Sequence, residues 1–426
     1  MSDVGNPTAR ASSHPPGLYV LFFTELWERY SFYSMVAILS LYMNEALHFS
    51  VAKVGQIYGA YTAGVYLMPV VGGLLADRLF GFGRAVIIGG VLMMFGHLLL
   101  GVEALPFFYA GLVLLACGSG LLKPNVSTLV GNLYRDRPEL RDQGFNIYYM
   151  GVNLGAFVSP LTVAWLRQHY GWSVAFMSAA VAMLFSLITF ITFRSRVAAA
   201  DVKADATSTR ATTLSRGEIR SRVITLLAIF GISLVFWIAF YQIFYTFTFW
   251  ARDNTATSWS PETFQTFEPL GVILLTPLLV AFWAWLQHRH AEPSTPVKML
   301  LGVTLVGAAF AALGYAGTIG GDAGRVSPLW LISANVLIAL GEISLSPMGM
   351  SLVNRLSPPQ LRGLMMGGWF ASLGLGGYLS GSIGVYWERL PHSRFFFMVV
   401  LILVAVAVPL SLLTPQIKRT MARAEA

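Results

Sequence analysis

Residues 72–85 read GGLLADRLFGFGRA, an apolar run that opens with two glycines and ends in a charged turn. Small residues allow a neighbouring membrane helix to approach closely. Asp77, Arg78 and Arg84 follow at the turn, where their charges can bond the ends of neighbouring helices. The stretch predicts a tight turn between two closely packed membrane helices, with a gating or structural role for these three residues. The alternative is a positively charged turn with no special role.

The composition of the whole chain agrees with a membrane protein. Of its 426 residues, 56% are hydrophobic and only 11% are charged, which excludes an ordinary soluble protein. Twelve apolar stretches are each near or above the ~20 residues that cross a bilayer as a helix. The sequence therefore predicts an all-α membrane protein with twelve transmembrane helices. The expected spans are 17–46, 54–79, 84–102, 105–130, 142–168, 172–193, 222–251, 262–287, 297–318, 329–355, 360–387 and 395–413.

Positive charge is distributed unevenly between the loops. The first sixteen residues are polar, so the first apolar run is expected to be a retained span and not a cleaved signal peptide. If the N-terminus is cytoplasmic, 20 of the 28 Lys and Arg residues fall on the cytoplasmic side and six on the other, as the positive-inside rule requires. Both termini are predicted to be cytoplasmic. Topology also explains the net charge of +8, so no nucleic-acid partner is expected.

The chain has a single cysteine, Cys117. This argues against an internal disulfide and against a Cys-based metal site.

A polar stretch divides the spans six to six. It is rich in Ala, Asp, Thr, Ser and Arg, the composition of a loosely ordered linker. We therefore expect two six-helix bundles. The expected domains are a cytoplasmic tail (1–16), an N-terminal bundle (17–193), a cytoplasmic linker (194–221), a C-terminal bundle (222–413) and a cytoplasmic tail (414–426).

Several spans contain ionisable residues, which cost roughly 2.5–3.5 kcal/mol each at bilayer depth. In ELWERYSFY (25–33), Glu25, Arg29 and Tyr33 fall at i, i+4 and i+8, on one helical face, with Glu28 alongside. The alternative is an internally neutralised ion pair that merely packs the bundle. Three further stretches are GLLKPNVSTLVG (120–131) with Lys123, FNIYYMGVNLGAF (145–157) with Asn153, and GEISLSPMGMS (341–351) with Glu342 and Ser346.

These stretches resemble known families. GGLLADRLFGFGRA is similar to the signature loop of the major facilitator superfamily, and the other four resemble motifs of its proton-dependent oligopeptide transporter (POT) family. The resemblance implies the two-bundle major facilitator fold and proton-coupled uptake of di- and tripeptides by alternating access. It implies a transporter and not an enzyme, with the proton as coupling ion and no other cofactor or metal. We further expect a monomer in a bacterial inner membrane.

Two positions depart from the family pattern. Tyr241 stands on helix 7 where many bacterial relatives have an acidic residue, and Glu268-Pro269 stands where helix 8 commonly has Asn-Pro. Relative to the family pattern, the chain therefore lacks a carboxylate on helix 7 and has an additional one on helix 8. We expect Glu268 to take part in proton or amino-terminus chemistry; the alternative is that it caps a helix.

The charges of the two halves are complementary to a zwitterion. The N-terminal half contributes Arg29 and Lys123, whereas the C-terminal half contributes Glu268 and Glu342 and no intramembrane cation. A peptide carboxylate would meet the two cations, and its ammonium would meet Glu342, helped by Asn153 and Glu268. Two or three extended residues reach about 7–10 Å. A di- or tripeptide therefore suits the gap between the bundles.

Glu25 and Glu28 are the expected proton-coupling residues, together with Arg29 and Lys123. Ion pairing and protonation of a carboxylate exclude each other, so protonation would free the cations for the peptide carboxylate. The expected substrate-binding residues are Arg29, Tyr33, Tyr66, Lys123, Asn153, Glu268, Glu342, Ser346 and Trp369, with Phe370 as a further candidate pocket wall. Two alternatives stay open: a transporter of this fold for nitrate, a sugar conjugate or a cationic drug, and a membrane-embedded enzyme.

Overall fold

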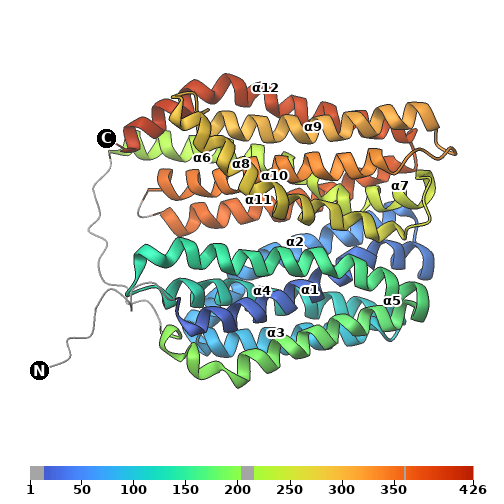
Figure 1. Ribbon diagram of the computed structural model, residues 1–426, viewed down its shortest axis with the longest axis horizontal. Coiled ribbons are helices and arrows are strands. Elements are labelled where there is room, and N and C mark those ends of the chain that lie inside the picture. The colour runs from blue at the N-terminus through green and yellow to red at the C-terminus, as the bar shows by residue number, and fades with distance from the viewer. Residues whose placement is uncertain (1–13, 203–214, 359–360, 426) are drawn as a thin grey trace, which may run out of the picture.

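The computed structural model describes residues 14–202, 215–358 and 361–425. These residues are helical, apart from turns and one isolated β-bridge between Thr255 and Val326. The helices run roughly along one axis in two halves, with α1–α5 on one side and α6–α12 on the other (Figure 1). The first described helix begins, and the last ends, at the same end of the molecule, here called the termini end (Figure 1). The opposite end is called the distal end.

The N-terminal half contains five long helices. Helices α1 and α2 each end in a π-helical turn, Tyr42–Ala46 and Ala76–Phe80. The helix bounds are α1 Pro16–Leu41, α2 Val51–Leu75, α3 Phe82–Leu100, α4 Leu105–Leu133 and α5 Arg141–Thr192. Helix α5 is broken at Gly171, whose φ of 84° and ψ of −176° are not helical. Because glycine adopts positive φ without a Cβ clash, the chain turns there and α5 provides two spans.

The C-terminal half supplies the other spans. The bounds are α6 Arg216–Phe240, α7 Thr246–Asn254, α8 Phe267–His288, α9 Thr295–Gly320, α10 Leu329–Leu356, α11 Arg362–Ile383 and α12 His392–Glu425. A 3-10 turn at Tyr241–Phe244 joins α6 to the short α7, so that the two form one span. Another, Pro261–Thr266, leads into α8.

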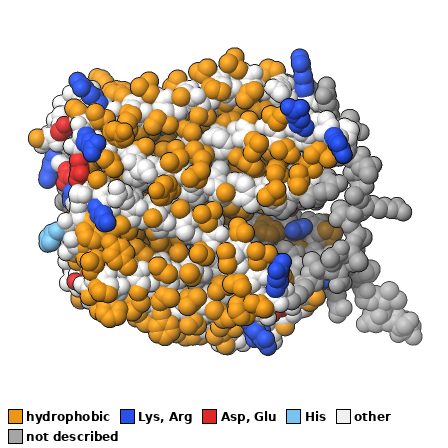
Figure 2. All heavy atoms as spheres, turned by 180° about the vertical axis from the view of Figure 1, so that it is seen from behind, with side chains coloured by type: hydrophobic (Ala, Val, Ile, Leu, Met, Phe, Trp, Pro, Cys, Tyr) orange, Lys and Arg blue, Asp and Glu red, His pale blue; other side chains and the backbone are white. Residues whose placement is uncertain are grey.

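Nine helical segments in the described part of the chain are long and apolar enough to cross a membrane by length and composition. One of them contains both arms of α5. Helix α1, with 26 residues, and α11, with 22, also have spanning length, although α1 contains three charged residues in its middle. Together these segments supply the twelve expected crossings. Figure 2 shows the corresponding surface, in which apolar side chains form a broad belt and charged side chains gather at the two ends.

Three boundaries differ from the sequence expectation. Helix α12 continues to Glu425, through residues that were expected to form the cytoplasmic tail (414–426). Pro409 and Pro415 both lie within the helix and do not end it. Helix α6 begins at Arg216, six residues early, where the Ser215 side chain accepts a hydrogen bond from the Glu218 backbone amide and so caps the helix. Residues 198–200 of the expected linker form a 3-10 turn. Residues 1–13 and 203–214 lie outside the described residues.

The halves meet mainly along α2 and α11. A Cβ atom at Gly55 would lie 2.5 Å from the carbonyl oxygen of Gly381, and one at Gly59 would lie 2.8 Å from that of Tyr378. The helices therefore touch backbone to backbone near the distal end. This contact positions the walls of the space that lies between the halves.

Candidate functional site

A cavity lies between the two halves. It contains about 700 Å³ of space not filled by atoms, including its mouth. Five of the residues expected to bind substrate line it: Tyr33, Tyr66, Asn153, Glu268 and Glu342. The other lining residues are Phe32, Val36, Tyr58, Tyr61, Thr62, Val65, Tyr149, Val152, Ala156, Trp237, Phe240, Tyr241, Phe244 and Pro269.

The charged residues of α1 form a buried ion-pair cluster beside this cavity. Arg29 Nε lies 3.0 Å from Glu25 Oε1 and 2.5 Å from Glu28 Oε2. All three side chains are at most 7% exposed. The i, i+4 spacing of Glu25 and Arg29 places them on one helical face, as the sequence predicts. Within the described structure, Arg29 Nη2 is buried and has no hydrogen-bond partner, so it remains able to bind an anion.

Helix α5 packs directly against this cluster. A Cβ atom at Gly155 would lie 2.6 Å from the backbone oxygen of Leu26 and 2.9 Å from Arg29 Cβ. The glycine therefore allows α5 to approach α1 at this level, which brings Asn153, two residues earlier, to the cavity wall. The Asn153 amide donates a hydrogen bond to the Tyr149 carbonyl at 3.0 Å. Its carbonyl oxygen can still accept one.

Lys123 contacts two aromatic residues of the cavity wall. Its ammonium lies 4.3 Å from the centre of the Phe32 ring and 5.4 Å from that of Tyr66. Both distances are within the range of cation–π attraction. Phe32 and Tyr66 line the cavity, whereas Lys123 contacts them but is not itself a lining residue. Helix α1 adds Arg29, whose guanidinium carbon lies 5.4 Å from the centre of the same Phe32 ring.

The opposite wall bears two carboxyl groups. Glu268 on α8 is 7% exposed, and it lines the same cavity as Glu342 on α10. The two helices approach closely beside them, because a Cβ atom at Gly271 would lie 2.8 Å from Ala339 Cβ. The structure thus places Glu268 and Glu342 on one wall of the cavity.

Four expected substrate-binding residues do not line the cavity: Arg29 and Lys123, described above, and Ser346 and Trp369. Trp369 is 1% exposed and packs against α10, where a Cβ atom at Gly349 would lie 2.2 Å from its ring. The missing side chain at Gly349 makes a slot for the indole, so in this conformation the expectation of a pocket wall at Trp369 does not hold. Ser346 is one turn beyond Glu342 but is not among the lining residues. Phe370, the further candidate wall, is 39% exposed and does not line the cavity either.

The charged turn after α2 is exposed. Asp77, Arg78 and Arg84 lie at the termini end between α2 and α3, as expected, and all three are solvent-exposed. Instead, Asp201 occupies the start of α3, where its Oδ1 accepts a hydrogen bond from the Gly83 backbone amide at 3.0 Å. In this conformation the three side chains do not make the expected bonds to helix ends within the described residues.

The distal end is held shut by ion pairs that the sequence analysis missed. Arg167 on α5 binds Glu262 of the other half, with an Nε–Oε1 distance of 2.5 Å, and Ser260 at 2.7 Å. Arg252 on α7, in the C-terminal half, donates a hydrogen bond to Asn44 Oδ1 in the N-terminal half at 2.8 Å. These residues lie in loops or at helix ends, where no periodic pattern distinguishes them from ordinary loop charges.

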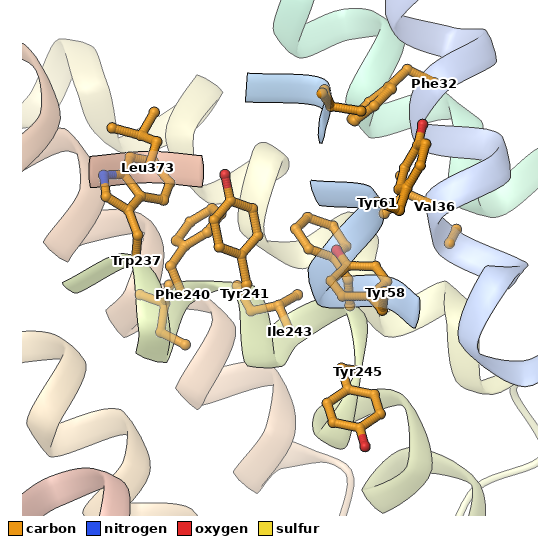
Figure 3. Packing of buried hydrophobic residues seen from close by; sticks show 14 of the residues in the cluster. Phe32, Val36, Tyr58, Tyr61, Trp237, Phe240, Tyr241, Ile243, Tyr245 and Leu373 are labelled. Atoms are coloured by element: carbon orange, nitrogen blue, oxygen red, sulfur yellow. The ribbon is translucent and has the colours of Figure 1, made fainter. Parts of the chain in front are cut away.

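Tyrosines and phenylalanines fill the space between these ion pairs and the cavity. Figure 3 shows Phe32 and Tyr61 from the N-terminal half opposite Phe240 and Tyr241 from α6 and its following turn, with Tyr58 and Tyr245 nearby. Tyr245 donates a hydrogen bond to the Val51 carbonyl across the halves. On the termini side, by contrast, Tyr149 lines the cavity and is 51% exposed. The cavity is therefore closed toward the distal end and open toward the termini end.

The N-terminal aromatic wall also contains a partner for the ion-pair cluster. Tyr148 on α5 is 7% exposed and lies beside the Glu25 carboxyl group. It and Tyr149 lie within the stretch FNIYYMGVNLGAF, in which only Asn153 had been selected. The adjacent tyrosines Tyr148 and Tyr149 were the feature of the sequence from which these two residues could have been selected.

Comparisons with known proteins agree with this architecture. The family model described as "POT family" matches residues 83–215 and 197–393. An uncharacterized transporter of Bacillus subtilis (strain 168), YclF, is 34% identical, with 96% of this chain and 95% of the relative covered. A di-/tripeptide transporter of Lactococcus lactis subsp. cremoris is 30% identical, with 96% of both covered. The crystal structure of a peptide transporter POT in complex with sulfate superposes with a TM-score of 0.88 at 30% identity, with 96% of both chains covered.

These matches confirm the expectations for the fold class and for the family. The solved POT structure covers 96% of the chain, and so matches both helical halves. The motifs quoted from the first, fourth, fifth and tenth spans thus led to the right family. The chain belongs to the POT family of membrane transporters.

Proposed function

We propose that this protein takes up di- and tripeptides together with protons, by alternating access of the central cavity. The observation that carries the proposal is that the N-terminal side of the cavity has cations, balanced by Glu25 and Glu28, whereas the charged lining residues of the C-terminal side are both carboxyl groups. Arg29 and Lys123 lie on the N-terminal side, and Glu268 and Glu342 on the C-terminal side. A zwitterion lying across the cavity satisfies both walls, whereas a simple anion leaves the two carboxyl groups without a cation. The L. lactis relative is a di-/tripeptide transporter, which supports the same substrate class.

In this proposal the peptide carboxylate binds between Lys123 and Arg29. The ammonium of Lys123 contacts aromatic rings at 4.3 and 5.4 Å, so it can turn toward a carboxylate without breaking a buried ion pair. Arg29 Nη2 offers a second donor. The peptide ammonium binds at Glu342 and Glu268, and the Asn153 carbonyl oxygen accepts from a peptide N–H. Tyr33 and Tyr66 provide apolar surface with few fixed hydrogen bonds, which suits varied side chains.

Glu25 and Glu28 supply the coupling to protons. Both contact Arg29, at 3.0 and 2.5 Å. A carboxylate cannot keep this ion pair and be protonated at the same time. Protonation from the outside therefore releases Arg29 toward the peptide carboxylate, and deprotonation after the cavity opens inward restores the pair and expels the peptide.

The orientation follows from the charges of the loops. We assign the termini end to the cytoplasm, because 20 of the 28 basic residues fall on that side in this topology. The cavity as described then faces the cytoplasm, and the ion pairs of Arg167 and Arg252 form the outer seal. The bacterial relatives support a place in a bacterial inner membrane. We further propose that the protein acts as a monomer of two helical bundles and has no nucleic-acid partner.

Uptake of radiolabelled dialanine into proteoliposomes tests the function. We expect accumulation above the external concentration when the outside is acidic, and its loss when a protonophore collapses the gradient. Lys53→Ala, which changes an exposed residue outside the cavity, is the control for reconstitution. If properly reconstituted protein binds and moves no dialanine under any gradient, the substrate assignment is wrong.

A further inference from the structure

The C-terminal wall of the cavity has one carboxyl group more than the ammonium of a peptide can balance. Glu268 and Glu342 both line the cavity, and none of the ion pairs between described residues contains either of them. The N-terminal side is balanced, because the two glutamates of α1 equal in number its two cations, Arg29 and Lys123. A zwitterionic peptide brings one ammonium to the C-terminal wall, so one of the two carboxylates there has no cation of its own.

Glu268 is the carboxyl group that lacks a partner. It is 7% exposed, and its Oε1 is buried without a hydrogen-bond partner among the described residues. A buried carboxylate is strongly unfavourable unless a cation or a hydrogen-bond donor compensates it. Glu342 is only partly buried, so it can meet the ammonium of an entering peptide. A second cation in the same ligand would therefore find its place at Glu268.

The helices separate the two carboxyl groups along the depth of the cavity. Helices α8 and α10 both run from the distal end toward the termini end (Figure 1), and they approach closely at Gly271 and Ala339. Glu268 lies three residues before Gly271. Glu342 lies three residues after Ala339. At about 1.5 Å per residue, the two backbone positions are about 9 Å apart along the helices, and Glu268 is the one nearer the closed distal end.

The walls of the cavity suit a long side chain that ends in a cation. Tyr33 and Phe244 line the cavity from opposite halves, with ring centres 6.2 Å apart. Phe240 and Tyr241 lie beside each other on the C-terminal side (Figure 3), with ring centres 5.8 Å apart. Aromatic rings offer apolar surface to the methylene stem of a lysine or an arginine, whose charged end stays free to reach a carboxylate. None of the described lining residues is a lysine or an arginine that would repel it.

We propose that Glu268 binds the cationic side chain of a peptide whose first residue is lysine or arginine. This inference rests on the proposed function and names a preferred substrate class within it. The α-ammonium of such a peptide binds at Glu342, and the side chain of the same residue extends toward the distal end, where its cation meets Glu268. Each carboxylate then has a cation. A first residue with an uncharged side chain leaves Glu268 without one, so peptides that begin with a basic residue bind more tightly.

Titration of purified protein with two matched dipeptides tests the proposal. Lysyl-alanine and norleucyl-alanine have the same four-carbon stem, and only the first has an amino group at its end. We expect the wild type to bind lysyl-alanine about 10- to 150-fold more tightly, the range for a hydrogen bond to a charged group. Glu268→Gln should bring the ratio of the two affinities to about one. Glu139→Gln, in an exposed loop, should leave the ratio unchanged.

Two more variants keep the test independent of a single substitution. Glu268→Asn, a second neutral variant, should lose the preference as well, whereas Glu268→Asp keeps the charge and should retain a preference for lysyl-alanine. Equal affinities in the wild type, or an undiminished ratio in a folded neutral variant, would overturn the proposal.

The position of the basic residue gives a further check. A preference of the same size for alanyl-lysine over alanyl-norleucine would overturn the placement of the first side chain at Glu268. All of these outcomes leave proton-driven uptake of dialanine standing, whereas wild-type protein that takes up no dialanine contradicts the proposed function itself.

Discussion

Replacing Gly55 by alanine should shift the carrier toward a state that is open at the distal end. The new Cβ would lie 2.5 Å from the Gly381 carbonyl oxygen and 2.7 Å from the Tyr245 hydroxyl. The first of these is a backbone atom of the opposing helix, so relief requires α2 and α11 to separate. This contact closes the distal end, and the strain therefore falls on the closed state.

The size of the shift follows from the cost of overpacking. Extra methyl groups in well-packed contacts cost about 1–3 kcal/mol, and a difference of this size changes an equilibrium by about 5- to 150-fold. We expect the ratio of distal-open to distal-closed protein to rise by a factor in this range. Gly73→Ala on the same helix is the matched control, because a Cβ atom there meets nothing within 4 Å.

Spin labels on the two halves measure the change. Gln168 and Ala323 are exposed at the distal end, on opposite halves, and each can be replaced by cysteine after Cys117→Ser. Pulsed electron resonance should show a longer-distance population that grows in Gly55→Ala and not in Gly73→Ala. An unchanged distance distribution in folded Gly55→Ala protein would refute the assignment of this contact as part of the distal closure.

Three further predictions concern transport and stability. Glu25→Gln combined with Glu28→Gln should retain counterflow of labelled dialanine but lose uphill uptake; continued accumulation against a gradient would show that these residues do not couple the proton. Lys123→Ala should weaken dialanine binding by about 10- to 150-fold, the equivalent of a charge-assisted hydrogen bond of 1.5–3 kcal/mol, whereas Lys53→Ala should bind normally; equal affinities in a titration would exclude Lys123 from the site. Trp369→Ala should destabilise the protein by about 3–5 kcal/mol, seen as a lower Tm, and an unchanged Tm would contradict its burial.

Local patterns of the sequence predicted the α1 cluster well. The spacing of Glu25, Glu28 and Arg29 fixes their geometry within one helix, and the structure shows the expected ion pairs. The twelve spans also followed from apolar length, although the continuation of α12 through Pro415 did not. Pro415 lies two residues beyond the expected end of this span at residue 413, and in the structure it lies inside the helix.

Contacts between distant segments were not predictable in the same way. The placement of Glu268 and Glu342 on one cavity wall accompanies the approach of α8 and α10 at Gly271 and Ala339, which no spacing within either helix reveals. The burial of Trp369 likewise depends on a glycine 20 residues earlier on another helix.

The distal seal shows the same limit. Arg167 and Glu262 are 95 residues apart, and each resembles an ordinary loop charge until the fold brings them together. Sequence reasoning therefore located the elements that carry the site. The pairing across the halves came only from the structure.

The most direct test of the account is a structure of the protein with bound dialanine. The charge complementarity of the two walls predicts the peptide carboxylate within hydrogen-bond distance of Lys123 and Arg29, and the ammonium within hydrogen-bond distance of Glu342 and Glu268. A peptide bound in the reverse direction, or outside the cavity between the halves, would contradict the account.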